Sequence, residues 1–457
     1  MINMGNNKKM IILILIALVI PIIGMGVLFI GMNFNTEIKV SDNLEGNITF
    51  VSNRTDKSVE IEALIKEFEE INPKVNVTLE LIGDAQSILQ RKASVGELPD
   101  VTLVPSTISK NEYRNYFLAL DDLGFNDSNI YNYFMGTGND YSLYCLNTSI
   151  TWQGIIYNKD IFKQANIDRL PTTIDELFQA CNKIEALGIT PIAINYRQSW
   201  TMDLWTDIIP HLFDNNLSND VMNENRQIMD SNGGSTGGDV ETSHHGIDIV
   251  DFTVDQRIGI VNRGYAEEDL FNYDWQQFKN DMSEGKIAMA IWNSDFIYQL
   301  EDMGMNIDSL GMFPIPETNT IKIYGDYMYA VSNTTDNPDT AKAFLKFIFE
   351  NNRYANAVNI MSPLKEDKET KEVLEKLGEL NIPIITYSDY ISKQSMEVAR
   401  LEDEFLQIKK ECGIDAAFVQ KFIIEDDIDR LINEINLKWN EQINKSIDND
   451  KNKVYTY

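Results

Sequence analysis

The chain has 457 residues, of which 43% are hydrophobic and 10% are aromatic. This composition supplies enough apolar surface for two lobes with separate cores, and it is too rich for a disordered protein. The 39 basic and 70 acidic side chains give a formal net charge of −31, spread along the chain. Such a surface repels phosphate backbones and anionic lipid, which argues against a nucleic-acid ligand.

An uncharged run over residues 10–32 follows Lys8 and Lys9. The run is longer than the core of a signal peptide and reaches the ~20 residues that a bilayer-spanning helix needs. The flanking lysines place residues 1–9 in the cytoplasm, and no cysteine follows the run to carry a lipid anchor. We therefore predict an uncleaved single-pass membrane anchor, a polar linker over residues 33–45, and a folded part outside the cell membrane.

The sequence beyond the linker alternates strand and helix patterns. Residues 48–52 (ITFVS) predict a buried strand, and residues 58–71 place apolar side chains on one helical face before Asn72-Pro73. Residues 75–81 alternate apolar and polar side chains, which is typical of a half-buried strand, and residues 101–104 predict another strand. Strands that alternate with helices indicate a parallel sheet and the α/β class.

Later segments contain further short sequence patterns that predict helices and strands. Thr173 and Glu176 match a capping box, which predicts a helix start, and Pro338 is typical of the first turn of another helix. Residues 287–292 and 327–332 are predicted strands, and about the last ninety residues are mostly helical.

Residues 214–246 form a polar insertion that contains a glycine-rich run and the pair His244 and His245. We interpret this segment as a solvated loop in preference to a metal site. The three cysteines have no CxxC or metal-ligand spacing, no glycine-rich phosphate loop follows a strand, and no Gly-x-Ser-x-Gly motif occurs. We therefore expect free, packed thiols, no catalytic residue, no metal and no cofactor.

Short motifs in these segments succeed one another in a recognisable order. They are SNRTD at 52–56, KEFE at 66–69, LPDV at 98–101, GIIYNKD at 154–160, PTTIDEL at 171–177, EGKIAM at 284–289, GMFPIP at 311–316 and DTAKAFL at 339–345. In this succession they resemble the family 1 extracellular solute-binding proteins of bacterial ABC importers, the sugar-binding type among them.

The resemblance implies a periplasmic-binding-protein-like fold of class II type, in which two α/β lobes joined by crossing strands close on a ligand by a hinge motion. The predicted boundaries are residues 46–154 and 312–365 for lobe 1, 155–311 for lobe 2, and 366–457 for a helical region mostly on lobe 2. We expect the first crossing near Gly154–Tyr157 and the return near Gly311–Pro314. The resemblance also implies a monomer whose partners are the transmembrane permease subunits of an ABC importer, which read the closed state.

A sugar presents hydroxyls on its rim and C–H groups on its faces, so its site needs short polar side chains beside planar aromatic ones. Such ligands sit outside the carboxyl ends of parallel strands, which selects loops that follow strands. From this rule and the resemblance we expect ligand contacts from Asn53, Thr55, Asp56, Ser106, Trp152, Tyr196, Trp200, Trp275, Trp292, Asp295, Asp326 and Tyr327. Structural roles stay open for some of them: Thr55 and Asp56 suit a helix cap, Trp275 suits an amphipathic helix, and Asp326 suits a turn.

One position departs from the family pattern. After Ala288-Met289 the family usually continues to a Gly-x-Trp whose Trp stacks on the sugar. Here Asp295 occupies the position of that Trp, and Trp292 stands three residues earlier. Either Trp292 provides the stacking, or the ligand meets a carboxylate, which would suit an amino sugar or another cationic or hydroxyl-rich solute.

These patterns favour an extracytoplasmic solute-binding protein that captures a small polar ligand, a sugar or oligosaccharide first of all, between its lobes and delivers it to an ABC permease. Two alternatives stay open. One is a ligand sensor for a membrane kinase on the same fold, and the other is a membrane-anchored glycoside hydrolase with two carboxylates about 5 to 10 Å apart.

Overall fold

The computed structural model describes residues 44–454 except residues 84, 203, 214–259, 261–263, 387–395 and 426. The anchor predicted over residues 10–32, the linker up to residue 43 and the polar insertion lie outside the described residues, so they stay predictions. Within the described part, no helix is both long enough and apolar enough to cross a bilayer.

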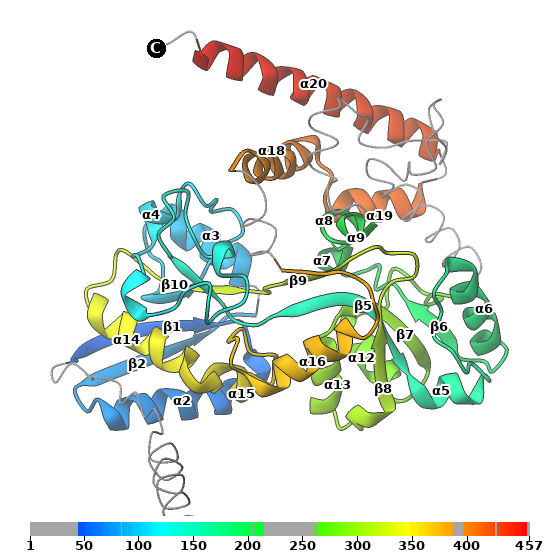
Figure 1. Cartoon of the computed structure of the whole chain (residues 1–457), viewed down its shortest axis with the longest axis horizontal. Helices are drawn as coiled ribbons and strands as arrows, with labels where there is room; N and C mark the ends of the chain where they lie inside the picture. Colours follow the sequence, from blue (N-terminus) through cyan, green and yellow to red (C-terminus); the bar gives the residue numbers. More distant parts are fainter. Residues whose placement is uncertain are drawn as a thin grey trace, which may run out of the picture.

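The first lobe is built on a five-stranded sheet (Figure 1). In spatial order its strands are β2 (Val75–Leu81), β1 (Gly46–Ser52), β3 (Val101–Leu103), β10 (Met328–Val331) and β4 (Cys145–Asn147). β1 runs parallel to β2 and β3, whereas β10 is antiparallel to both of its neighbours. The lobe's main helices are α2 (Ser58–Ile71), α3 (Ala85–Ser94), α4 (Tyr113–Tyr116), α14 (Pro338–Phe349) and α15 (Arg353–Val358).

The second lobe is built on a six-stranded sheet. Its strands are β11 (Ile384–Thr386), β9 (Ile321–Tyr324), β5 (Thr151–Asn158), β7 (Ile287–Asn293) and β6 (Thr190–Ala193) in spatial order, with β8 (Leu310–Phe313) paired to β5. The helices of this part are α5 (Lys159–Gln164), α6 (Ile174–Glu185), α7 (Ser199–Met202), α8 (Leu204–Asp207), α9 (Ile209–Phe213), α12 (Trp275–Ser283) and α13 (Phe296–Asp302). The two-lobed α/β architecture expected from the sequence is thus confirmed.

The chain passes from one sheet to the other at points that differ from those we predicted. Residues 148–150 lead from β4 in the first sheet to β5 in the second, and residues 325–327 lead back from β9 to β10. The predicted crossings at Gly154–Tyr157 and Gly311–Pro314 were wrong. The first segment lies within β5, and the second covers the end of β8 and the residue after it. These two strands pair with each other in the second sheet. An apolar run predicts a strand from local pattern, but its partners in a sheet are decided by distant residues.

Each lobe has its own apolar core. The first-lobe core combines residues from Ile48 to Leu364, and the second-lobe core combines residues from Ile155 to Ile443. A third connection leads from α15 through α16 (Lys368–Gly378) to β11 in the second sheet.

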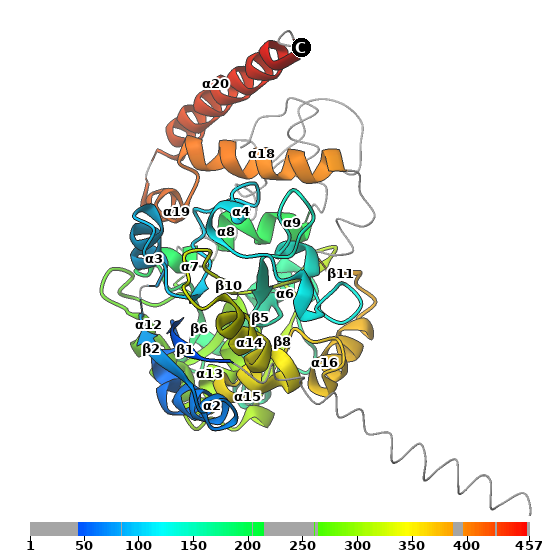
Figure 2. The same ribbon diagram turned by 90° about the vertical axis from the view of Figure 1, so that its left-hand side faces the viewer.

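Three C-terminal helices lie above the lobes in Figures 1 and 2: α18 (Met396–Cys412), α19 (Ala416–Ile424) and α20 (Ile428–Val454). Their buried side chains Phe405, Phe422 and Trp439 belong to the second-lobe core. Cys145, Cys181 and Cys412 are buried and no disulfide joins them, as expected from their spacing.

Candidate ligand-binding site

Charged side chains from both lobes meet where the chain crosses between the sheets. Arg54 follows β1 in the first lobe, Asp295 follows β7 in the second lobe, and Asp326 lies in the second crossing. Asp295 lies 3.5 Å from Thr151 Oγ1, and Thr151 pairs with Tyr324, two residues before Asp326. Arg54 and the two carboxylates also influence one another's pKa. β1 and β7 therefore bring polar groups together at their carboxyl ends, as the rule for open α/β sheets requires. We call Arg54, Asp295 and Asp326 the junction site.

Arg54 is held in place by Asp56. Its Nε and Nη2 atoms donate to the two carboxylate oxygens at 2.9 and 2.8 Å, which is a bidentate ion pair. Partial burial opposes ionisation of Asp56, but the hydrogen bonds from Arg54 outweigh it and keep the pKa of Asp56 below its ordinary value. We expected Asp56 to accept hydrogen bonds from a ligand. Instead both of its oxygens face Arg54, a residue that our candidate set omitted although its two neighbours were in it.

Asp295 stands directly before α13 but does not cap that helix through its side chain. The side-chain hydrogen bonds to its carboxylate are long, 3.5 Å from Thr151 Oγ1 and 3.4 Å from Gln299 Nε2. Burial raises the pKa of Asp295, and the hydrogen bond from Gln299 and the charge of Arg54 oppose this rise. Asp295 is therefore a poorly satisfied carboxylate in a site of low hydration.

Asp326 is exposed to solvent, yet its pKa is raised to about 7. The first cause is loss of hydration to the surrounding protein and the second is the negative charge of Asp295, while Arg54 acts in the opposite direction. A carboxylate that solvent reaches but hydrates poorly has protein around it on several sides. This combination is typical of groups in binding sites.

Neutral polar groups extend the junction site toward the second sheet. Gln153 Nε2 donates to Tyr324 Oη at 2.6 Å and to Asn293 Oδ1, and Tyr324 Oη donates to the same oxygen. Gln153 Oε1 is buried without a hydrogen-bond partner. Asn147 Oδ1 is also buried and unpartnered, and it lies so close to Gly325 that a Cβ there would come within 2.3 Å of it. Two amide oxygens near the crossings thus have unused acceptor capacity.

Most of the aromatic side chains that we expected to contact a ligand are buried in the apolar cores. Trp152 is only 4% exposed and packs between the crossings with Ile323 and Met361. Tyr196 is buried with its ring centroid 5.3 Å from that of Phe271.

Two other tryptophans pack together in the second lobe. Trp292 is buried and its ring centroid lies 5.3 Å from that of Trp275, which keeps part of its surface exposed. Tyr327 is half-buried against the first-lobe core, and the side chain of Trp200 lies outside the described part of α7.

The remaining polar candidates lie in loops of the first lobe. Asn53 is half-buried, Thr55 is exposed in a short 3-10 helix (Thr55–Lys57), and Ser106 is exposed with its backbone N–H donating to Gln86 Oε1 at 2.8 Å. No side chain caps the start of that 3-10 helix or of α2, so Thr55 and Asp56 do not play the capping role that stayed open.

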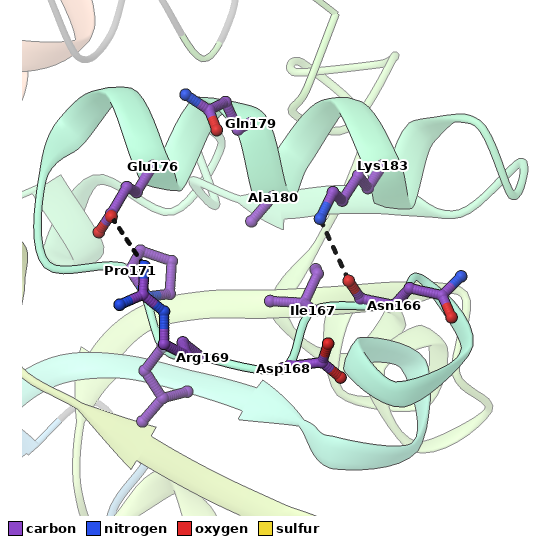
Figure 3. A pocket seen from close by; sticks show the side chains of 10 residues that line it. Asn166, Ile167, Asp168, Arg169, Pro171, Glu176, Gln179, Ala180 and Lys183 are labelled. Atoms are coloured by element: carbon purple, nitrogen blue, oxygen red, sulfur yellow. Dashed lines mark hydrogen bonds and ion pairs between the residues drawn. The ribbon is translucent and has the colours of Figure 1, made fainter.

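A separate pocket of about 250 Å³ lies at the outer edge of the second lobe, between the segment Asn166–Pro171 and α6 (Figure 3). Lys183 Nζ donates to the carbonyl oxygen of Asn166 at 3.1 Å across it, and Arg169 pairs with Glu176 at 3.8 Å. This pocket contains no junction-site residue and no aromatic side chain.

The fold and the junction of two lobes define a protein of the solute-binding class. Residues 52–352 match the family described as bacterial extracellular solute-binding protein. The chain belongs to this family, which confirms the resemblance seen in the sequence motifs.

Solved structures share the architecture. A binding protein of an ABC transporter from Bifidobacterium animalis subsp. lactis, in complex with mannobiose, has a TM-score of 0.74 at 21% identity and covers 90% of this chain and 98% of its own. A sugar transporter protein from Bacillus licheniformis, in complex with stachyose, has a TM-score of 0.64 at 15% identity and covers 87% of this chain and 100% of its own. At these identities the likeness establishes the fold.

Among curated proteins, the multiple sugar-binding protein of Streptococcus mutans is 26% identical over 174 residues. The aligned stretch makes up 36% of this chain and 40% of that protein, so the chain matches about two fifths of this relative's length.

Proposed function

We propose that this protein captures a small carbohydrate between its two lobes and delivers it to an ABC permease. The observation that carries the proposal is the meeting of Arg54, Asp295 and Asp326, one from each lobe and one from a crossing. A hinge motion at residues 148–150 and 325–327 would bring these groups onto a ligand. The sugar ligands named for the relatives support a carbohydrate as cargo.

The chemistry of the junction site suits a polyol. Arg54 donates to hydroxyl oxygens, and the two carboxylates accept from hydroxyl hydrogens, so both hydrogen-bonding capacities of a sugar hydroxyl find a partner. Trp275 is partly exposed and stays our candidate for stacking on a sugar face. The anchor predicted over residues 10–32 would hold the lobes near the permease.

The first test is a binding screen of the purified full-length chain against mono- and oligosaccharides, read by thermal shift and then calorimetry. A bound sugar raises the melting temperature because it binds the folded state alone. We expect Arg54→Ala to weaken binding by about tenfold or more, since a hydrogen bond to a charged group contributes about 1.5–3 kcal/mol.

Arg169→Ala is the matched control, because it removes the same group from the edge of the pocket in Figure 3. We expect this variant to bind like the unaltered protein. If the Arg54→Ala variant and the unaltered protein bind with equal affinity, the junction site is not the binding site. If no glycan binds to the unaltered protein, the proposed carbohydrate function is wrong.

Two neighbouring carboxylates, one with a pKa near 7, are also the kind of groups that a glycoside hydrolase uses as acid and base. The family consists of binding proteins, and we expect no turnover. Incubation with each bound oligosaccharide, followed by an assay for new reducing ends, tests this expectation. A sensor for a membrane kinase would be distinguished by which membrane protein, permease or kinase, co-purifies with the full chain.

A further inference from the structure

We infer that the solute carries a protonated amine and that its ammonium group binds between Asp295 and Asp326. This inference rests on the proposed function and narrows it to amino sugars and oligosaccharides that contain them. It draws on the charge balance of the junction site and on the buried oxygen atoms beside it.

The charges at the junction site do not balance. The bidentate pair with Asp56 already neutralises Arg54, and this leaves the carboxylates of Asp295 and Asp326 in excess. Among the described residues, neither carboxylate forms an ion pair with a lysine, arginine or histidine. A poorly hydrated carboxylate without a counter-charge is unfavourable, so a cation in this position stabilises the complex.

Unpartnered acceptors provide the second observation. Gln153 and Asn147 are 3% and 2% exposed, and in each the amide oxygen has no hydrogen-bond partner while the amide nitrogen is used. Gln153 donates to Tyr324, whose hydroxyl is near enough to sense both acids, and Asn147 lies against Gly325, the residue before Asp326. Two acceptors without a donor therefore belong to residues that contact Tyr324 and Gly325, the neighbours of Asp326 in the chain.

An ammonium group suits two unpaired carboxylates and the nearby unpartnered amide oxygens better than a hydroxyl does. It offers three donors and no acceptor, whereas a hydroxyl offers one donor and also requires one. A metal cation fits less well, since the described residues contain no cluster of three acidic, histidine or cysteine side chains that could hold one. The raised pKa of Asp326 agrees with an acid pair that lacks its cation.

The test compares three β-1,4-linked disaccharides of similar shape on the full-length chain at neutral pH. They are the glucosamine dimer, with free amines, N,N′-diacetylchitobiose, with amides, and cellobiose, with hydroxyls. We expect calorimetry to give at least about tenfold tighter binding for the free amine than for either neutral analogue, because it alone supplies the counter-charge. This preference is expected to shrink at high salt.

Asp326→Asn and Asp295→Asn should each reduce the preference for the amine over cellobiose to about threefold or less, because each removes one negative charge from the ammonium site. Asp168→Asn, at the pocket in Figure 3, is the control and should keep the full preference. The comparison of ligands on the unaltered protein decides the question even where a variant fails to fold.

Two failures are distinguishable. The inference is overturned if a neutral disaccharide binds as tightly as the glucosamine dimer or more tightly. It is also overturned if only neutral glycans of the wider screen bind. In both cases the proposed carbohydrate function stands. If no glycan binds at all, both are overturned. A preference for the amine that persists in both asparagine variants would overturn the assignment to Asp295 and Asp326.

Discussion

Asp326 is the residue in which the tertiary structure changes the chemistry most. Its pKa rises from 3.8 to about 7, first because the surrounding protein removes hydration and second because Asp295 is negatively charged. The carboxyl group therefore holds a proton in the folded protein at a pH at which the unfolded chain has released it. Folding and the ionisation of Asp326 are linked for this reason.

The sign of the linkage follows from the direction of the shift. Between pH 3.8 and about 7 the unfolded state binds fewer protons at this group than the folded state, so the contribution of Asp326 to stability falls as pH rises through that window. We expect the ligand-free Asp326→Asn variant to gain in melting temperature over the unaltered protein as pH is raised from about 4 to about 8. Scanning calorimetry of both proteins across this range measures the difference, and a difference independent of pH would contradict the shift.

At the scale of elements, the end of α13 connects the second lobe to the first. Lys57 Nζ, just before α2, lies 2.7 Å from Asp302 Oδ1, and Asn359 Nδ2 lies 3.3 Å from Glu301 Oε2. The acidic partners of both contacts lie in the second lobe, and Lys57 and Asn359 lie in the first. Any motion that separates the lobes at this side must break them.

We therefore expect Lys57→Ala to favour a more open protein. A partly buried ion pair contributes up to about 1 kcal/mol, so ligand affinity should fall by no more than about fivefold. X-ray scattering should give a larger radius of gyration for the ligand-free variant.

A charge exchange, Lys57→Asp with Asp302→Lys, should restore both the ligand affinity and the radius of gyration of the unaltered protein. Lys66→Ala serves as the control, because its pair with Glu70 is exposed and lies within α2. Unchanged scattering in Lys57→Ala would show that this contact does not hold the lobes together.

The molecule as a whole depends on its last helices. The second-lobe core collects side chains from Ile155 to Ile443, and Trp439 on α20 is 1% exposed with its ring centroid 5.6 Å from that of Phe405 on α18. These helices are therefore part of the second lobe's packing and not an appendage to it.

Trp439→Ala is expected to lower the free energy of unfolding by about 3–5 kcal/mol, because it leaves a cavity in this core. Leu437→Ala, on the same helix but 66% exposed, should change it by about 0.5 kcal/mol or less. Urea unfolding followed by circular dichroism compares the two. Equal effects of the two substitutions would mean that α20 does not pack on the lobe as described.

The sequence by itself determined the elements and the family. The predicted helix at Ser58–Ile71 and strand at Val75–Leu81 coincide with α2 and β2, and Thr173 caps α6 by accepting from the Glu176 backbone N–H. These features were predictable because periodicity, caps and turns act between residues a few positions apart.

Only the tertiary structure decided which strands pair and which polar groups meet. The pairing of β5 with β8, the burial of Trp152 between the crossings and the approach of Arg54 to Asp295 all join residues more than a hundred positions apart. Local pattern gives each strand two faces but does not identify its neighbours in the sheet. The junction site therefore follows from sheet order and from the competition of whole side chains for the same interior space.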